Sequence, residues 1–218
     1  MRFADRRQAG RFLAQRLARY ADNPAVIVLA LPRGGVPVAF EVARGLNAPL
    51  DVFIVRKLGL PGHEEFAMGA IASGGVMVMN PDLAGVHVQE AAVEEVAARE
   101  RTELARREAL YRGDRAPLAV EARIVIIVDD GLATGSTMLA AARAVKRRSP
   151  KEVVIAVPVA AAETCRILRA EVDDVVCAFT PEPFRAVGLW YDDFTQVSDA
   201  EVRSLLDAAW ESEARGTA

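Results

Sequence analysis

The sequence predicts an α/β protein in which a parallel sheet is flanked by helices on both faces. Short apolar runs rich in β-branched residues recur along the chain, which is typical of strands buried on both faces. Segments with helical spacing alternate with these runs, and this alternation favours a parallel sheet. The chain has 218 residues, of which 52% are apolar, so we expect a single domain over residues 1–218 with one substantial core.

The composition argues against nucleic-acid and membrane partners. Lys and Arg total 27 against 30 Asp and Glu, a net charge of −3, and the basic residues have acidic neighbours. No apolar run approaches the ~20 residues of a membrane span, and residues 1–7 contain no apolar signal sequence. We therefore expect a cytoplasmic location.

The two cysteines and two histidines show no pattern of a metal site. Cys165 and Cys177 have no Cys-x-x-Cys partner, and His63 and His87 do not cluster with them. Zinc ligands and disulfide frameworks have characteristic spacings that are missing here. We expect neither feature.

The first predicted elements are a helix, a strand and a second helix. Asp5 is placed to cap a helix that continues to about residue 21 and covers the sheet. Residues 25–31 form an apolar strand, and residues 36–46 have helical spacing. Between them lies Pro32-Arg33-Gly34-Gly35, whose glycines allow close approach of the backbone to a ligand. The alternative is an ordinary tight turn that needs positive φ angles.

A further strand is predicted at residues 50–55, with Arg56 and Lys57 at its end. Open α/β sheets bind ligands at the carboxyl ends of their strands, where two cations suit an anion. The alternative is a solvated strand end. Residues 58–75 are rich in glycine and predict a mobile flap that then returns as a strand, with a hairpin around Ser73-Gly74-Gly75 leading into a strand at residues 76–79.

The flap, at about residues 57–80, contains His63, Glu64 and Glu65. We expect His63 to be a loop residue and both glutamates to be solvated, although either glutamate is a candidate proton partner. After the flap, about residues 88–112 predict a long charged helix with a thin apolar stripe. Such a stripe favours packing on the domain or on a second subunit, so a homodimer is one expectation.

The most informative stretch begins with a predicted strand at residues 124–128. Asp129-Asp130 stands at its end, and Gly-Leu-Ala-Thr-Gly-Ser-Thr follows at residues 131–137. A helix comes next, with Ser136 or Thr137 as its candidate N-cap. Small residues leave backbone amides open to an anion at the positive end of the helix dipole. Carboxylates accept hydrogen bonds from sugar hydroxyls, so the loop suits a ribose 5-phosphate.

Four apolar residues, two acids and Gly-x-Ala-Thr-Gly-Ser-Thr resemble the 5-phosphoribosyl-1-diphosphate (PRPP) motif of the type I phosphoribosyltransferases. The resemblance extends from Leu29 to Val197, and residues 125–137 are its specific part. A P-loop kinase or a dinucleotide-dependent oxidoreductase is poorly supported, since neither fingerprint is present. The alternative is a strand-turn-helix corner with solvated aspartates.

The resemblance implies the type I phosphoribosyltransferase fold with a small hood and a flexible flap. Asp129 and Asp130 would orient the ribose 2- and 3-hydroxyls, with Mg²⁺ held nearby through PRPP and water. The 5-phosphate would bind Gly131, Leu132, Ala133, Thr134, Gly135, Ser136 and Thr137. The diphosphate would bind Arg33, Gly34, Gly35, Arg56 and Lys57. Arg33 and Lys57 would join the two aspartates as catalytic residues.

The remaining segments complete the sheet and its edge. Strands are predicted at residues 153–159 and 175–179, with one helix between them and another at the end of the chain. Residues 180–197 are irregular and aromatic, and the resemblance makes them the hood. Three aromatic residues would stack on an acceptor base or form a small satellite core, namely Phe184, Trp190 and Tyr191.

The expected function is transfer of a phosphoribosyl group from PRPP to a nitrogen acceptor, a nucleobase or related heterocycle, with release of diphosphate, as in nucleotide salvage. Ala133 replaces the aspartate that hypoxanthine-type members place near purine N7, which disfavours a 6-oxopurine acceptor handled in that way. The sequence looks closest to bacterial phosphoribosyltransferase-like proteins of unassigned acceptor. The alternative is a regulatory protein that binds PRPP or a nucleotide without turnover.

Overall fold

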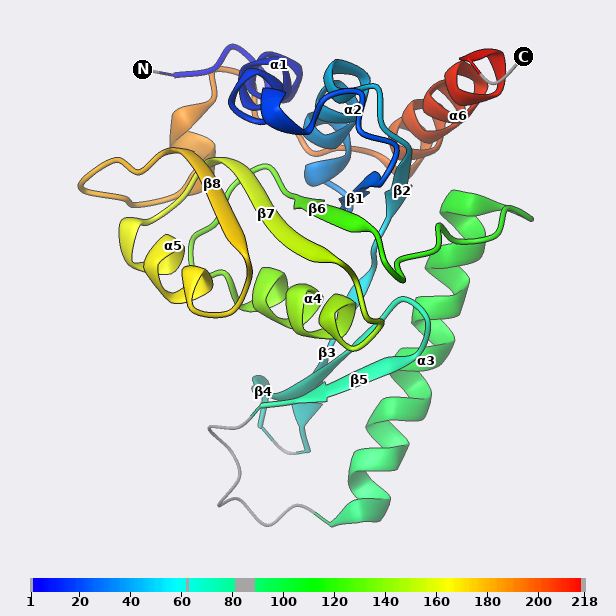
Figure 1. Cartoon of the computed structure of the whole chain (residues 1–218). Coiled ribbons are helices and arrows are strands. Elements are labelled where there is room, and N and C mark those ends of the chain that lie inside the picture. The colour runs from blue at the N-terminus through cyan, green and yellow to red at the C-terminus, as the bar shows by residue number, and fades with distance from the viewer. Residues whose placement is uncertain (1, 62, 81–88, 217–218) are drawn as a thin grey trace.

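A five-stranded parallel sheet in the order β2-β1-β6-β7-β8 forms the centre of the computed structural model, which describes residues 2–61, 63–80 and 89–216 (Figure 1). Its strands are β1 (Val26–Ala30), β2 (Leu50–Val52), β6 (Ile124–Val128), β7 (Glu152–Val159) and β8 (Asp174–Phe179). Every neighbouring pair is parallel. The predicted α/β class is confirmed.

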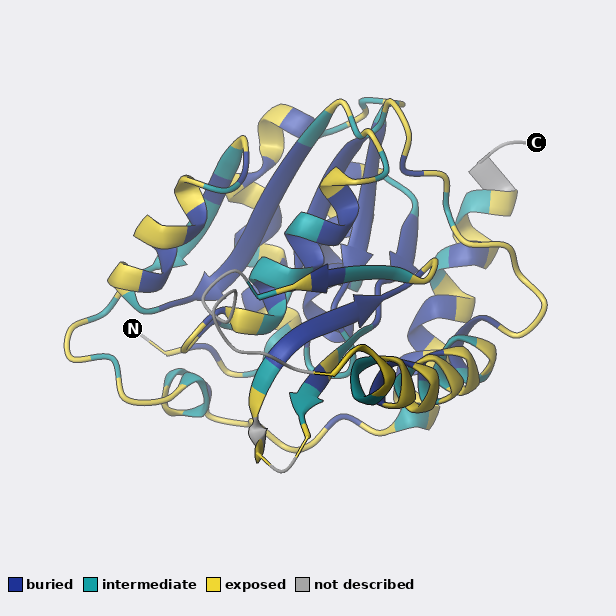
Figure 2. Ribbon diagram, turned by 90° about the horizontal axis from the view of Figure 1, so that it is seen from below, coloured by how far each residue is buried: buried dark blue, intermediate teal, exposed yellow. Residues whose placement is uncertain are grey.

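Helices cover both faces of this sheet, as Figure 1 shows. One face carries α1 (Arg6–Arg16), α2 (Gly35–Leu46) and α6 (Asp199–Gly216), and the other carries α4 (Ser136–Lys146) and α5 (Ala162–Arg169). Side chains of β1 and β6 alternate between two cores: Val28 and Ile126 pack on the first face, and Leu29 and Ile127 on the second. All residues of both strands are buried, and Figure 2 shows the strands of the central sheet largely in dark blue.

A separate antiparallel sheet follows the first two strands. It consists of β3 (Val55–Leu60), β4 (His63–Ala72) and β5 (Val76–Met79). The strand predicted at residues 50–55 is therefore wrong in its second half. The chain leaves the parallel sheet after Val52, because the amide of Ile54 donates to the Ser73 hydroxyl at 2.9 Å and the Ser73 amide donates back to the Ile54 carbonyl.

The predicted flap is mostly strand in the described residues, and His63 lies in β4 rather than in a loop. The side chains of Glu64 and Glu65 lie outside what the structure describes. The predicted turn between the last two strands is confirmed, with φ angles of 82° at Gly74 and 74° at Gly75. Glycine adopts such angles without strain.

The long helix α3 (Glu90–Arg112) runs beside the antiparallel sheet (Figure 1). Its predicted first residue, at position 88, lies outside the described residues. The buried Arg112 fixes the far end of the helix, since its Nε donates to the Asp51 carboxylate at 2.8 and 2.9 Å and its Nη2 donates to the Val52 carbonyl at 2.7 Å. This pair joins α3 to β2.

Helix α1 packs closely on α2 through glycine contacts. A Cβ atom on Gly10 would lie 2.6 Å from the Val38 carbonyl oxygen, and one on Gly45 would lie 2.8 Å from the Ala14 Cβ. The predicted N-cap is confirmed, since the Asp5 carboxylate accepts a hydrogen bond from the backbone N–H of Gln8 at 2.6 Å. Helix α1 ends at Arg16, earlier than predicted, and a short 3-10 turn follows at Ala18–Tyr20.

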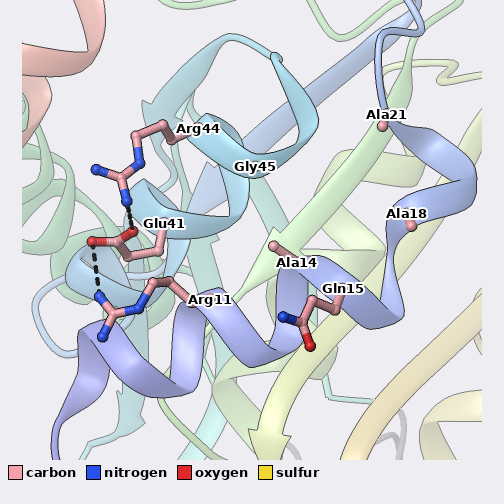
Figure 3. Close-up of a pocket in the computed structure, with 8 residues that line it drawn as sticks. All are labelled: Arg11, Ala14, Gln15, Ala18, Ala21, Glu41, Arg44 and Gly45. Carbon is pink, nitrogen blue, oxygen red and sulfur yellow. Dashed lines mark hydrogen bonds and ion pairs between the residues drawn. The ribbon is translucent and has the colours of Figure 1, made fainter.

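A surface pocket of about 340 Å³ opens between α1 and α2 (Figure 3). Glu41, whose side chain is only 1% exposed, lies at its edge and pairs with Arg44 at 2.6 Å and with Arg11 and Arg7 at 3.7 Å. A buried carboxylate requires such cationic partners. The pairs from Arg7 and Arg11 to Glu41 join α1 to α2.

The expectation that the two cysteines form no disulfide is wrong. Cys165 on α5 and Cys177 on β8 form a disulfide, with Cα atoms 6.8 Å apart. Their sequence spacing matches no motif, because the packing of α5 against β8 brings them together. Across residues 2–61, 63–80 and 89–216, no helix has the length and apolar character needed to cross a membrane.

Chemical reduction of this disulfide should lower the free energy of unfolding by about 2–4 kcal/mol, because the unfolded chain regains conformational freedom. Denaturant unfolding with and without a dithiol reductant measures the change. A Cys165→Ser variant should show no such dependence on the reductant. Thiol titration of the denatured, unreduced protein should find no free thiol, and two reactive thiols would contradict the disulfide.

Candidate active site

The loop after β6 is anchored at Leu132. This side chain is buried, its amide donates to the Val159 carbonyl at 3.0 Å, and its carbonyl accepts from the Ala161 amide at 3.1 Å. Leu132 was predicted to contribute to phosphate binding, but its amide is already engaged. It fixes the loop on the end of β7, next to the residues that were predicted to bind the phosphate.

The backbone amides from Ala133 to Thr137 have no hydrogen-bond acceptor among the described residues. Gly135, with φ 70° and ψ 4°, is the N-cap of α4, and no side chain caps this helix. The predicted cap by Ser136 or Thr137 is wrong, because the chain enters the helix through a left-handed residue. The positive end of α4 is therefore open to an anion.

Helix α5 supports this loop from the other side. The Thr164 hydroxyl donates to the Ala133 carbonyl at 2.5 Å. A Cβ atom on Gly135 would lie 2.6 Å from Thr164 Cγ2, so this close contact requires glycine. The positive φ of Gly135 favours glycine for a second reason. The carbonyl of Ala133 is thereby satisfied, and the loop is held in one shape.

The turn between β1 and α2 lies directly against the two aspartates. A Cβ atom on Gly34 would lie 2.1 Å from Asp130 Oδ2, and one on Gly35 would lie 2.8 Å from the Val128 carbonyl oxygen. The sequence predicted that these glycines allow close approach. In the structure the approach is to the acidic pair, and the Pro32–Arg33 peptide before the glycines is cis.

Asp129 and Asp130 are half-buried side by side. Asp129 Oδ1 accepts from the Asp130 amide, and Asp130 Oδ2 accepts from Arg6 Nε, both at 2.8 Å. Within the described part of the chain, Asp129 Oδ2 and Asp130 Oδ1 have no protein donor. These two oxygens are the acceptors that the site offers to a ligand.

Burial raises the pKa of Asp129 well above its ordinary value, and the negative charge of Asp130 raises it further. Burial also raises the pKa of Asp130, although the Arg6 guanidinium opposes this effect. The pair therefore carries a charge that the protein only partly compensates. Ligand hydroxyls or a cation would stabilise it.

The predicted cations differ in their placement. Arg33 is 35% exposed, and its Nη1 lies 3.7 Å from the Asp199 carboxylate. Exposed Lys57 lines a pocket of about 210 Å³ together with Ser136 and Thr137, so it lies beside the loop.

The prediction that Arg56 and Lys57 stand at the end of a parallel strand is wrong, because both residues belong to β3 of the antiparallel sheet. Successive residues of a strand point to opposite faces, so Arg56 is directed away from Lys57. Its Nε and Nη2 donate to Glu100 on α3 at 2.9 and 2.7 Å. We assign it to the contact between α3 and the flap strands.

The hood aromatics mostly form a satellite core. Tyr191 is buried, its ring lies 5.8 Å from that of Phe3, and its hydroxyl donates to the Asp130 carbonyl at 2.5 Å. Phe184 and Trp190 are half-buried against the same cluster. Tyr191 therefore contacts the backbone of Asp130 and is too buried to stack on a base, whereas Phe184 and Trp190 keep exposed surface.

Arg6 is a site residue that the sequence prediction missed. Its ion pair with Asp130 joins residues that are 124 positions apart, so no local motif reveals it. One sequence signal was available. The first turn of α1 contains no acidic residue but begins with arginine, which opposes the usual preference of a helix N-terminus.

Comparison with known proteins decides the family. The sequence profile of the phosphoribosyl transferase domain matches residues 4–182. The chain belongs to the type I phosphoribosyltransferase family. The predicted motif at residues 125–137 lies within the matched segment.

Two relatives of this phosphoribosyltransferase domain occur in Mycobacterium tuberculosis strains CDC 1551 and H37Rv, and both are provisionally named phosphoribosyl transferases. Each is 49% identical over 208 residues, which cover 95% of this chain and 47% of the relative. This chain thus spans about half of their length. The crystal structure of TT1426 from Thermus thermophilus has a TM-score of 0.85 at 47% identity, covering 94% of this chain and 98% of that one.

Asp129→Asn should raise Tm at neutral pH by about 2–5 °C. The raised pKa in the folded protein means that the charged carboxylate costs folding free energy. This cost is fully present above the folded pKa and disappears below about pH 4, where the aspartate of the unfolded chain is also protonated. The gain in Tm should therefore shrink as the pH falls.

Calorimetric melting of both proteins from about pH 4 to about pH 8 measures this difference. Asp114→Asn is the matched control, because Asp114 is exposed and the charge change is the same. A lower Tm for Asp129→Asn at neutral pH, or an equal gain in the control, would contradict the conclusion that the charged Asp129 carboxylate destabilises the folded protein.

Proposed function

We propose that this phosphoribosyltransferase domain transfers a 5-phosphoribosyl group from PRPP to a nitrogen acceptor and releases diphosphate. One observation supports this above the others. The amides from Ala133 to Thr137 face no acceptor among the described residues, at an uncapped helix N-terminus directly after Asp129 and Asp130. A ligand with a phosphate and neighbouring hydroxyls matches both halves of this site.

Each half then has a defined role. The 5-phosphate accepts hydrogen bonds from the loop amides, and the dipole of α4 favours its negative charge. The ribose 2- and 3-hydroxyls donate to Asp129 Oδ2 and Asp130 Oδ1, the two oxygens without a donor in the described part of the protein. This two-point contact fixes the sugar ring relative to the glycine turn.

The diphosphate belongs on the side of that turn. Gly34 and Gly35 lie against the acidic pair, so a leaving group on the ribose is close to their backbone. Arg33 and Lys57 supply the positive charge, from the turn and from β3 respectively. Stabilisation of the departing diphosphate by fixed charges is the main catalytic effect that these residues provide.

The acidic pair also fits a hard divalent cation. Arg6 pairs with Asp130 alone, so the Asp129 carboxylate lacks a cationic partner within the described residues. Mg²⁺ prefers oxygen ligands and is held by few carboxylates together with waters and substrate phosphates. Bound through PRPP and water beside Asp129 and Asp130, it would neutralise the charge that develops on the diphosphate.

The acceptor would approach from the hood. Phe184 and Trp190 are half-buried in this segment and keep surface on which a flat ring can stack. Ala133 supplies no carboxylate at the loop, so no side chain at that position acts as a base toward a purine nitrogen. We propose a nucleobase or related heterocycle as the acceptor, in a salvage reaction.

Diphosphate release from PRPP and Mg²⁺ against a panel of purines, pyrimidines and small amines tests this function. Acceleration by one acceptor would identify the reaction. PRPP binding without release by any acceptor would instead favour a regulatory protein that senses PRPP. Absence of PRPP binding would contradict both.

The double variant Asp129→Asn, Asp130→Asn should weaken PRPP binding at least about 100-fold, because two charge-assisted hydrogen bonds to the sugar are weakened together. Titration calorimetry with Mg²⁺ present measures the affinity. The matched control is Asp173→Asn, Asp174→Asn, an acidic pair at the amino end of β8, on the opposite edge of the sheet. Unchanged affinity in the first variant would exclude the assigned ribose site.

A further inference from the structure

The residues before α1 are paired with the hood. The Phe3 amide donates to the Trp190 carbonyl at 2.8 Å, and the amides of Asp192 and Asp193 donate to the carbonyls of Phe3 and Ala4 at 2.8 and 2.9 Å. These main-chain hydrogen bonds tie the start of α1 to the segment that follows Trp190. Arg6, the first residue of α1, projects from this junction.

Arg6 is held by three different contacts. Its Nε donates to Asp130 Oδ2 at 2.8 Å, and its Nη1 donates to the Thr195 carbonyl at 2.8 Å. Its guanidinium carbon lies 3.9 Å from the centre of the Phe194 ring. The side chain is only 11% exposed, and that of Asp130 is 14% exposed, so solvent screens this pair weakly.

This placement has a local cost. A cation at the first turn of a helix opposes the helix dipole, and burial of an arginine side chain removes hydration and rotamer freedom. Arg7 on the same turn avoids the cost of burial, since its side chain is 48% exposed and pairs loosely with Glu41 at 3.7 Å.

The geometry also shows which Asp130 oxygen remains available. Oδ2 lies between Arg6 and the backbone of Gly34, where even a methyl group would lie within 2.1 Å. Oδ1 has no donor among the described residues. Arg6 therefore occupies the enclosed oxygen and does not compete for the accessible one.

We propose that Arg6 is a positioning residue of the ribose site. It fixes the Asp130 carboxylate so that Oδ1 accepts from a ribose hydroxyl of PRPP. Through Thr195 and Phe194 it also couples that carboxylate to the hood. This inference rests on the proposed function. The planar guanidinium suits the role, because it reaches Asp130 and Thr195 from separate nitrogens while its face packs on a ring.

Arg6→Gln should weaken PRPP binding by about 10- to 100-fold, the range expected when a partly buried charge-assisted hydrogen bond is lost. In turnover the loss should appear mainly in KM for PRPP. Arg6→Lys, which keeps the charge but lacks the fork, should recover part of the affinity. Arg7→Gln is the matched control on the same helical turn and should bind PRPP within about twofold of wild type.

Titration calorimetry with PRPP and Mg²⁺, with Tm measured for every variant, separates the outcomes. Weaker binding by Arg6→Gln with Tm close to wild type, and partial recovery in Arg6→Lys, supports the positioning role. Equal or tighter binding by a folded Arg6→Gln protein overturns it while the proposed function stands. Failure of the wild-type protein to bind PRPP overturns the proposed function and this inference with it.

Discussion

Two adjacent carboxylates, half-buried at the end of β6, are the constraint to which the surrounding structure is adapted. Burial and mutual repulsion raise the pKa of Asp129 and oppose its ionisation. The fold compensates only in part, through Arg6 on one carboxylate and a backbone amide on the other. Gly34 is required because any side chain there would collide with Asp130. The remaining uncompensated charge is typical of a site that is stabilised by its ligand.

The candidate anion site beside this pair consists of unpaired backbone groups. Val159 on β7 accepts from the Leu132 amide and Thr164 on α5 donates to the Ala133 carbonyl, whereas the amides from Ala133 to Thr137 stay without acceptors among the described residues. The disulfide between Cys165 and Cys177 lies next to Thr164 in sequence and fixes α5 to β8. A loop held from outside keeps its shape before the ligand arrives, which lowers the entropic cost of binding.

Local pattern predicted the parallel sheet and the motif loop, because continuous β-branched runs, adjacent acids and small residues are all short-range signals. Contacts between distant segments were missed. The pairing of Cys165 with Cys177 and the contact of Arg6 with Asp130 depend on how helices pack on the sheet. The predicted strand at residues 50–55 was too long because Ser73, which redirects Ile54, comes from another hairpin. The different roles of Arg56 and Lys57 could not be predicted, because they depend on which face of β3 each side chain occupies and the antiparallel sheet was not expected there.

A crystal structure of the chain with PRPP and Mg²⁺ tests the central assignment most directly. The 5-phosphate should lie on the amides from Ala133 to Thr137, with the ribose hydroxyls on Asp129 Oδ2 and Asp130 Oδ1 and the diphosphate against Gly34 and Gly35. Arg6 should keep its contact with Asp130 Oδ2. A phosphate bound elsewhere, or a ribose that makes no contact with the two aspartates, would contradict the site and the function built on it.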